Sequence, residues 1–94
     1  MKSFKFVQKI THATKPTNAE RTADLPITPF PRMFVVICGR MFLVQEVRAV
    51  AGSEEVTVFL RNNNKYYTEK VDRLLAFCVE MESEGWTIED WEKK

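Results

Sequence analysis

The sequence predicts an α+β fold in which one C-terminal helix packs on an antiparallel sheet of three to four strands, either open or curled into a small SH3-like barrel. Three observations lead to this fold class. Residues 33–61 divide into three segments rich in β-branched and aromatic residues, separated by turn residues. Residues 69–84 repeat apolar side chains at helical spacing. The chain has 94 residues, which suits one domain with one modest core, assigned to 1–94.

The central strands define two faces of the predicted sheet. They are expected at 33–38, 41–50 and 55–61, with Gly39-Arg40 as the first turn, because glycine adopts the positive φ of tight hairpins. Side chains alternate along a strand, so one face is purely apolar and the other is mixed. The apolar face carries Met41, Leu43, Val47, Ala49, Val56, Val58 and Leu60, and the mixed face carries Phe42, Val44, Glu46, Arg48, Val50, Glu55, Thr57, Phe59 and Arg61. A β-bulge would reverse these faces from that point on.

Two segments precede this region. Residues 3–10 alternate apolar and polar side chains and predict an edge strand, whose lysines discourage unwanted pairing. Residues 11–32 contain all four prolines and are predicted to be a proline-rich connecting loop, since proline restricts both itself and the residue before it. The alternative for this loop is a recognition arm that docks its few apolar residues on a partner.

The clearest predicted helix covers 69–84. Thr68 is expected to cap its first turn and Gly85 to end it. Its apolar stripe, which should lie on the apolar face of the sheet, contains Val71, Leu74, Leu75, Cys78 and Met81. Residues 86–94 fit either a short terminal helix, which a capping pattern favours, or an added edge strand.

The residue inventory argues against an enzyme. His12 is the single histidine and lies in a predicted loop, while Cys38 and Cys78 are both expected to be buried free thiols. A nucleophile–base pair and a zinc site therefore lack their residues. The three glycines form no phosphate-binding loop. We expect no enzymatic activity, no cofactor and no bound metal.

Charge and hydropathy bear on location and partners. The N-terminal segment has lysines throughout, and no apolar run approaches a membrane span, so a cytoplasmic protein without membrane contact is expected. The net charge of +1 argues against strongly electrostatic binding of nucleic acid. Residues 1–68 carry ten Lys/Arg against five Asp/Glu, while 69–94 carry four against eight. The sheet end is therefore basic and the C-terminal end acidic.

A surplus of aromatic residues predicts a protein-interaction module. Trp86 and Trp91 lie on a short acidic tail, and tryptophan, tyrosine and arginine are typical interface anchors. We expect a non-enzymatic inhibitor or adaptor that binds a protein partner, of the kind found among phage and plasmid accessory proteins, with homo-oligomerisation left open. The predicted partner-binding residues are Trp86, Trp91, Phe42, Phe59, Arg48, Arg61 and Tyr66.

The alternative function is nucleic-acid binding through the mixed sheet face. The residues concerned are Phe42, Val44 and Phe59 with Arg48 and Arg61, and Tyr66 or Tyr67 beside them. There the aromatic side chains would stack bases while the arginines contact phosphates. Against this, the N-terminal strand and the proline-rich segment can cover that face, so that Phe42 and Phe59 form a second small core. Large exposed apolar patches are rare on stable monomers, which favours the covered arrangement.

Overall fold

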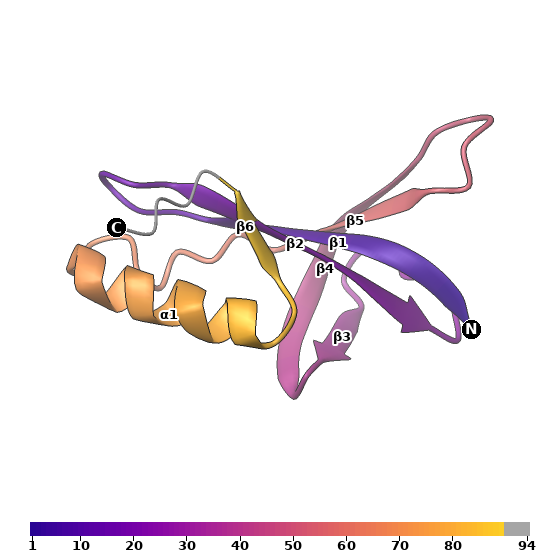
Figure 1. Ribbon diagram of the computed structural model, residues 1–94. Helices are drawn as coiled ribbons and strands as arrows, with labels where there is room; N and C mark the ends of the chain where they lie inside the picture. Colours follow the sequence, from indigo (N-terminus) through magenta and orange to yellow (C-terminus); the bar gives the residue numbers. More distant parts are fainter. Residues whose placement is uncertain (90–94) are drawn as a thin grey trace.

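The computed structural model describes residues 1–89 and shows an α+β domain: a curled, six-stranded mixed sheet in the form of a half-barrel, with one helix (Figure 1). The elements are β1 (Lys2–Ile10), β2 (Thr17–Leu25), β3 (Phe34–Ile37), β4 (Arg40–Ala49), β5 (Val56–Leu60), α1 (Val71–Ser83) and β6 (Thr87–Glu89). Their order across the sheet is β3-β4-β5-β1-β2-β6. The fold class is confirmed. The predicted three to four strands are too few, and the sheet is not purely antiparallel, because β1 and β5 run parallel.

β1 is a central strand and not the predicted edge strand. It pairs with β2 along all nine of its residues and with β5 on its other side. Phe4 and Phe6 are 1% and 0% exposed, so the alternating pattern does mark a half-buried strand. Alternation identifies a strand and its faces, but it carries no information about how many neighbours the strand has.

The partner of β1 comes from the predicted proline-rich loop. Residues 17–25 of that loop form β2, which leaves irregular chain only at 11–16 and 26–33. β2 has few large apolar residues, and only Thr17 and Ala19 are buried in it. Its order comes from the backbone ladder with β1, a source of stability that composition does not reveal.

A β-bulge in β4 changes which side chains enter the core. Val44 pairs with Leu60 but Glu46 pairs with Phe59, so Gln45 is an extra residue in the strand. Before the bulge, Phe42 and Val44 are buried while Met41 is 67% exposed. The predicted apolar face is therefore wrong for the first half of β4, since uninterrupted alternation mixes residues from both sides of the sheet.

The β3–β4 hairpin turns one residue earlier than predicted. Cys38 and Gly39 occupy its two central positions, with φ of 51° and 80°. Two positive φ values mark the mirror-image turn that suits the right-handed twist of paired strands. This placement leaves Cys38 exposed, which corrects the prediction of a buried thiol, whereas Cys78 is buried as expected.

α1 begins two residues later and ends one residue earlier than predicted, and Gly85 stops it as expected. Lys70 stands at its N-cap position without a side-chain cap, so Thr68 does not have the expected role. At the other end Gly85 has φ 96°, and the Gly85 and Trp86 N–H groups donate to the Glu82 and Met81 carbonyls at 3.0 and 3.2 Å. This pair of bonds is a Schellman motif, which needs glycine at the left-handed position.

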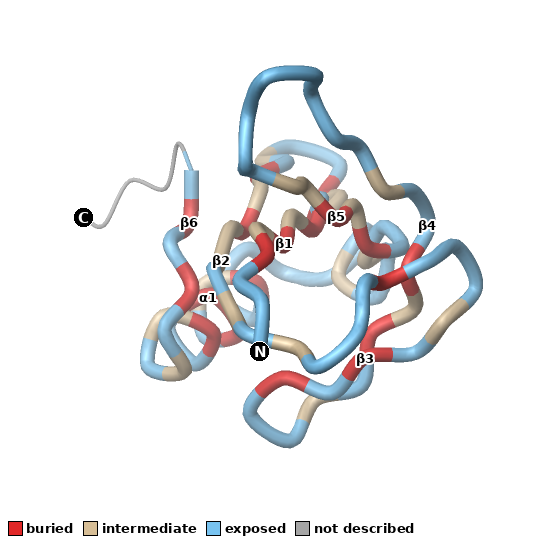
Figure 2. Tube along the Cα trace, turned by 90° about the vertical axis from the view of Figure 1, so that its right-hand side faces the viewer, coloured by how far each residue is buried: buried red, intermediate tan, exposed pale blue. Residues whose placement is uncertain are grey.

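The core joins the concave side of the sheet to one face of α1. From the predicted helical stripe Leu74, Cys78 and Met81 are buried, whereas Val71 is 38% exposed. Phe77, which flanks the stripe, is also buried. Figure 2 shows the buried positions gathered inside the curled trace and the connection after β4 fully exposed. The largest fully buried side chains are Phe4, Phe6, Ile10, Val44, Val58, Leu74, Cys78 and Met81.

The segment after the helix is a strand and not the favoured terminal helix. Gly85 turns the chain, and Thr87–Glu89 pairs antiparallel with residues 18–20 of β2. Ile88 is buried next to Ala19, which extends the core to this edge. The remaining part of the prediction, including Trp91, falls on 90–94 and lies outside the described residues.

Candidate protein-binding surface

Two of the predicted partner-binding residues belong to the core. Trp86 is 3% exposed and Phe42 is 7% exposed, and their ring centroids lie 5.3 Å apart at a tilt of 53°. A tilted contact at this distance is a favourable aromatic pair. Neither side chain is available as a surface anchor, which corrects the prediction for both. Trp91 lies outside residues 1–89.

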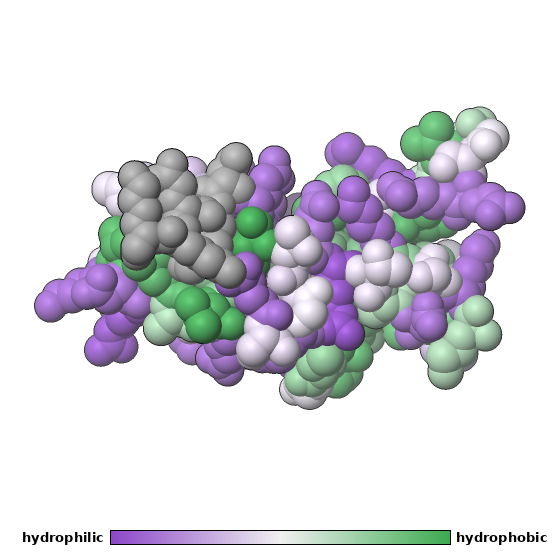
Figure 3. Space-filling model, viewed as in Figure 1, coloured by the Kyte–Doolittle hydropathy of each residue, from purple (hydrophilic) through white to green (hydrophobic). Residues whose placement is uncertain are grey.

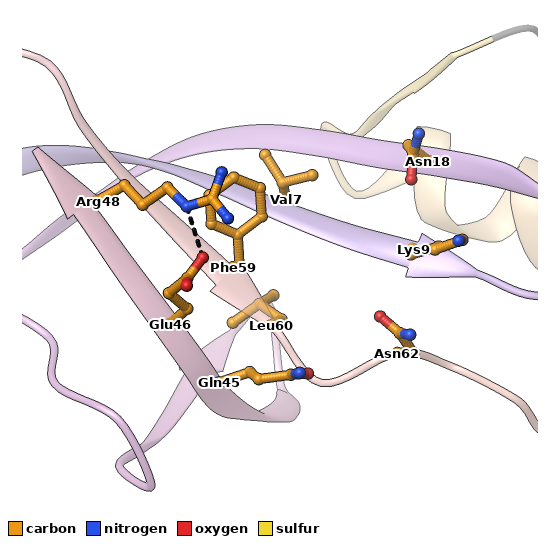
Figure 4. A pocket seen from close by; sticks show the side chains of 9 residues that line it. All are labelled: Val7, Lys9, Asn18, Gln45, Glu46, Arg48, Phe59, Leu60 and Asn62. Carbon is orange, nitrogen blue, oxygen red and sulfur yellow. Dashed lines mark ion pairs between the residues drawn. The ribbon is translucent and has the colours of Figure 1, made fainter. Parts of the chain in front are cut away.

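Phe59 and Arg48 come together on the convex face of the sheet, where they border an open hollow (Figure 4). The Arg48 guanidinium lies 4.7 Å from the centroid of the Phe59 ring, and its Nε is 2.5 Å from a carboxylate oxygen of Glu46. The cation is therefore paired, and it covers the ring on which a base would stack. The full lining is Val7, Lys9, Asn18, Gln45, Glu46, Arg48, Phe59, Leu60 and Asn62.

Arg61 and Tyr66 lie apart from that hollow. The Arg61 side chain is exposed, while its backbone N–H donates to the Leu43 carbonyl at 2.8 Å and its carbonyl accepts from Gln8 Nε2 at 3.1 Å. Tyr66 stacks on Phe77 of α1 with ring centroids 4.7 Å apart. The members of the predicted set that lie within residues 1–89 are thus dispersed over the core, the convex sheet face and the side of the helix, and do not form one site.

A salt-bridge cluster fixes the β3–β4 hairpin to the end of α1. The Arg40 guanidinium donates to both Glu84 carboxylate oxygens, with Nε and Nη2 each 2.9 Å from their nearest partner, and it also pairs with Glu80 at 2.6 Å. It lies 5.3 Å from the centroid of the Phe77 ring. The hydrogen bond from Glu84 raises the pKa of Arg40 above its ordinary value. Such a two-pronged pair fixes orientation as well as distance, so the hairpin is held rigidly.

The outer face of this hairpin carries three exposed apolar side chains that lie next to one another. Phe34, Val36 and Met41 are 60%, 62% and 67% exposed, and Val36 is the direct cross-strand partner of Met41. We call these three residues the outer hairpin patch. Figure 3 shows apolar colouring over the β3–β4 hairpin at the lower edge of the molecule. A contiguous group of exposed apolar side chains is the kind of surface feature through which proteins bind one another.

Sequence reasoning missed this patch for two reasons. The run 33–38 is continuously apolar and reads as a strand buried on both faces, whereas only Val35 and Ile37 are buried in it. Uninterrupted alternation also placed Met41 on the buried face. The available signal was the turn: a two-residue turn at Cys38-Gly39 makes Met41 the partner of Val36 and assigns both to one face.

β3 also has a free backbone edge. It is the first strand in the sheet order and pairs with β4 alone among the described residues. The Val44 N–H donates to the Met33 carbonyl at 2.8 Å, which makes Met33 a hydrogen-bonded partner in the ladder. Pairs alternate in an antiparallel ladder, so Val35 and Ile37 also bond toward β4. The backbone N–H and C=O groups of Phe34 and Val36 therefore point away from the sheet.

His12 is buried and hydrogen-bonded within the fold. His12 is 6% exposed; its Nδ1 accepts the Thr14 and Lys15 N–H groups at 3.1 and 3.2 Å. Backbone N–H groups only donate, so the ring is the neutral tautomer whose Nε2–H donates to the Glu69 carbonyl, 2.8 Å away. This histidine ties the β1–β2 loop to the segment before α1. Neither Cys38 nor Cys78 is among its described partners.

The last findings concern metal-binding groups, membrane-spanning helices and similar proteins. Within residues 1–89, no three His, Cys, Asp or Glu side chains form a group that would hold a metal ion. The described chain also contains no helix with the length and apolar character needed to cross a membrane. No family model, curated protein or solved structure matches this chain.

Proposed function

We propose that this chain is a small non-enzymatic protein-interaction module, an inhibitor or adaptor, that binds a protein partner through the outer hairpin patch. The observation that supports this function is the exposure of Phe34, Val36 and Met41, each above half, on two paired strands. Each leaves apolar area in water, and covering such area is favourable by about 25 cal/mol per Å².

The position of the patch also suits binding. Strand β4 is paired on both sides, and the Arg40–Glu84 contact holds the hairpin against α1. A surface that is already ordered pays little conformational entropy when a partner binds. The patch is therefore a better candidate than the C-terminal tryptophans, of which Trp86 is committed to the core.

Nucleic acid is the less suitable ligand for the faces described. The patch itself is apolar, and Arg48, the cation that lies over the half-buried Phe59 ring on the convex face, is paired with Glu46. A nucleic-acid surface needs unpaired cations interleaved with open aromatic faces. The net charge of +1 also argues against a nucleic-acid ligand.

Site-specific crosslinking tests the proposed function. A photoreactive phenylalanine analogue is placed at Met41 in the native host, and at Val79 of α1 as the control, because Val79 is also apolar and 57% exposed. The partner captured from position 41 is then purified. Its affinity should fall about tenfold or more for Met41→Ser, which corresponds to about 1.4 kcal/mol, and stay within about twofold for Val79→Ser. Equal effects of the two substitutions, or no capture specific to position 41, would contradict the proposal.

A further inference from the structure

The free edge of β3 faces a second free edge across a slot in the half-barrel. β6 covers only residues 18–20 of β2, so residues 21–25 of β2 have no strand on that side among the described residues. An opening of about 390 Å³ lies between this part of β2 and β3. We call it the β2–β3 slot; its lining consists of Arg21, Thr22, Ala23, Asp24, Leu25, Val36, Ile37 and Cys38.

One end of the slot is closed by side chains. Arg21 Nη1 lies 3.2 Å from the Cys38 Sγ, so this arginine reaches from β2 to the tip of the β3–β4 hairpin. Its Nε is buried without a hydrogen-bond partner in the described structure. The two strands are thus close enough for a long side chain to bridge them, yet they share no backbone ladder. Figure 2 shows β2 and β3 on opposite sides of the curled trace.

We propose that the β2–β3 slot binds an extended segment of the protein partner, which adds a strand between β2 and β3 and closes the half-barrel. This inference rests on the proposed function and specifies the form of its partner. Strand addition satisfies the outward backbone groups of Phe34 and Val36 together with those of β2. A closed barrel has no unpaired strand edges. The curled six-stranded sheet of this chain is already a half-barrel, so one added strand would bring it nearer to closure.

The slot selects a single extended segment over a folded sheet. Neighbouring strands lie about 4.8 Å apart, so a strand inserted between two edges has room for its own backbone only. The edge strand of a second copy of this chain is backed by its own sheet, and β2 stands where that sheet would have to be. The slot therefore favours a single inserted segment over a homodimer formed edge to edge through β3.

The lining predicts the sequence pattern of the segment. Ala23, Leu25 and Ile37 belong to the core or pack against it, so inward-facing side chains of the segment meet an apolar surface. Thr22 and Asp24 are exposed on the outer side, and none of the described ion pairs includes Asp24. The matching segment alternates apolar and polar residues and carries a basic side chain opposite Asp24.

The test uses a displayed library of random ten-residue peptides, selected on the full chain. The selected peptides should alternate in hydrophobicity and should bind Val36→Pro at least tenfold more weakly. Proline removes the Val36 N–H that points into the slot, while it removes no hydrogen bond of the β3–β4 ladder. The matched control is Val36→Thr, which keeps the N–H and a branched side chain, and should bind within about threefold of the natural chain.

A second measurement does not depend on the folding of a variant. In the best selected peptide, N-methylation of either alternate set of backbone nitrogens should weaken binding at least tenfold, because one set bonds β3 and the other bonds β2. If N-methylation weakens binding for only one of the two sets, the peptide pairs with a single strand edge, and insertion into the slot is overturned. Absence of any selected binder, or binders indifferent to Val36→Pro and to methylation, also overturns it.

The partner captured from position 41 separates this inference from the proposed function. Val36 also belongs to the outer hairpin patch, so Val36→Pro is compared with Val36→Thr. Weakening by Met41→Ser, together with a loss for Val36→Pro that exceeds the loss for Val36→Thr, supports both. Weakening by Met41→Ser with equal effects of Val36→Pro and Val36→Thr preserves the interaction function and overturns strand insertion, since Met41 lies on β4 and offers no edge to the slot. Insensitivity to both substitutions overturns both proposals.

Discussion

At the scale of single residues, the Phe42–Trp86 pair shows how a tail tryptophan becomes part of the core. The Schellman turn at Gly85 directs Trp86 inward, and the bulge in β4 places Phe42 opposite to it. Trp86→Ala should therefore lower the free energy of unfolding by about 3–5 kcal/mol. Phe34→Ala removes an aromatic ring that is 60% exposed and should cost less than about 1 kcal/mol. Urea denaturation measures the free energy of unfolding of both variants. Similar decreases for the two would show that Trp86 is not buried in the core.

The two cysteines should differ in how they affect stability at high pH. Burial, with the Glu82 carboxylate adding to it, raises the pKa of Cys78 to about 11. The thiol of the unfolded chain ionises at about pH 8.5, so between that pH and about 11 the unfolded state binds fewer protons than the folded state. Stability from this group is therefore complete below pH 8.5 and is lost as the pH rises, by up to about 3 kcal/mol.

The measurement compares the pH dependence of unfolding for two variants. Cys78→Ala should remove the part of the decline between pH 8.5 and 11 that belongs to this thiol, relative to the natural chain. Cys38→Ser, at an exposed position, should keep it. An unchanged slope in Cys78→Ala would contradict the assignment.

At the scale of elements, the Cys38-Gly39 turn determines which side chains of the β3–β4 hairpin reach water. An added Cβ at Gly39 would meet no atom within 4 Å, so the cost of Gly39→Ala is conformational alone. A φ of 80° should make that cost about 1–2 kcal/mol. Asparagine tolerates the left-handed region, so Cys38→Asn should be neutral or stabilising. Thermal unfolding of the two variants tests the turn assignment. A larger loss of stability for Cys38→Asn than for Gly39→Ala would exclude a turn with Cys38 and Gly39 at its centre.

The β4 bulge gives a prediction that is specific to one residue. Deletion of Gln45 joins Val44 directly to Glu46, and regular alternation then keeps Phe42, Val44 and Val47 on their present faces. The shortened chain should unfold cooperatively with a loss of about 1–3 kcal/mol. Deletion of Leu43 instead moves Phe42 to the opposite face and should prevent folding. Circular dichroism melting of the two deletions separates the cases, and equal behaviour would contradict a bulge at Gln45.

At the scale of the whole molecule, β1 determines where the chain resists unfolding. It lies between β2 and β5, and its hairpin with β2 spans residues 2–25. Within residues 1–89, limited proteolysis should therefore cut first in the connection at 50–55, where every residue is exposed, and not within β2. Sequencing of the first fragments measures this. First cuts at 17–25 would show that this segment is the loop that its composition suggests.

The sequence by itself determined the local features of this protein. Alternating Phe4 and Phe6, the helical stripe of Leu74, Cys78 and Met81, and the stop at Gly85 all follow from side-chain periodicity and the conformational freedom of glycine. These patterns are local because each depends on residues within one or two turns of the chain. They were enough to predict an α+β domain with a C-terminal helix.

Only the tertiary structure decided pairing, register and the exposed surface. β2 is ordered by a ladder to β1 that leaves no trace in its own composition, and β1 pairs with β5 across some fifty residues of chain. One extra residue, Gln45, moves Phe42 inward and Met41 outward, which shifts the candidate site from the predicted aromatic residues to the outer hairpin patch. The side-chain period of a strand is two, so a single unpaired residue reverses a face. Whether a residue is unpaired depends on the partner strand, and periodicity within one segment carries no information about that strand.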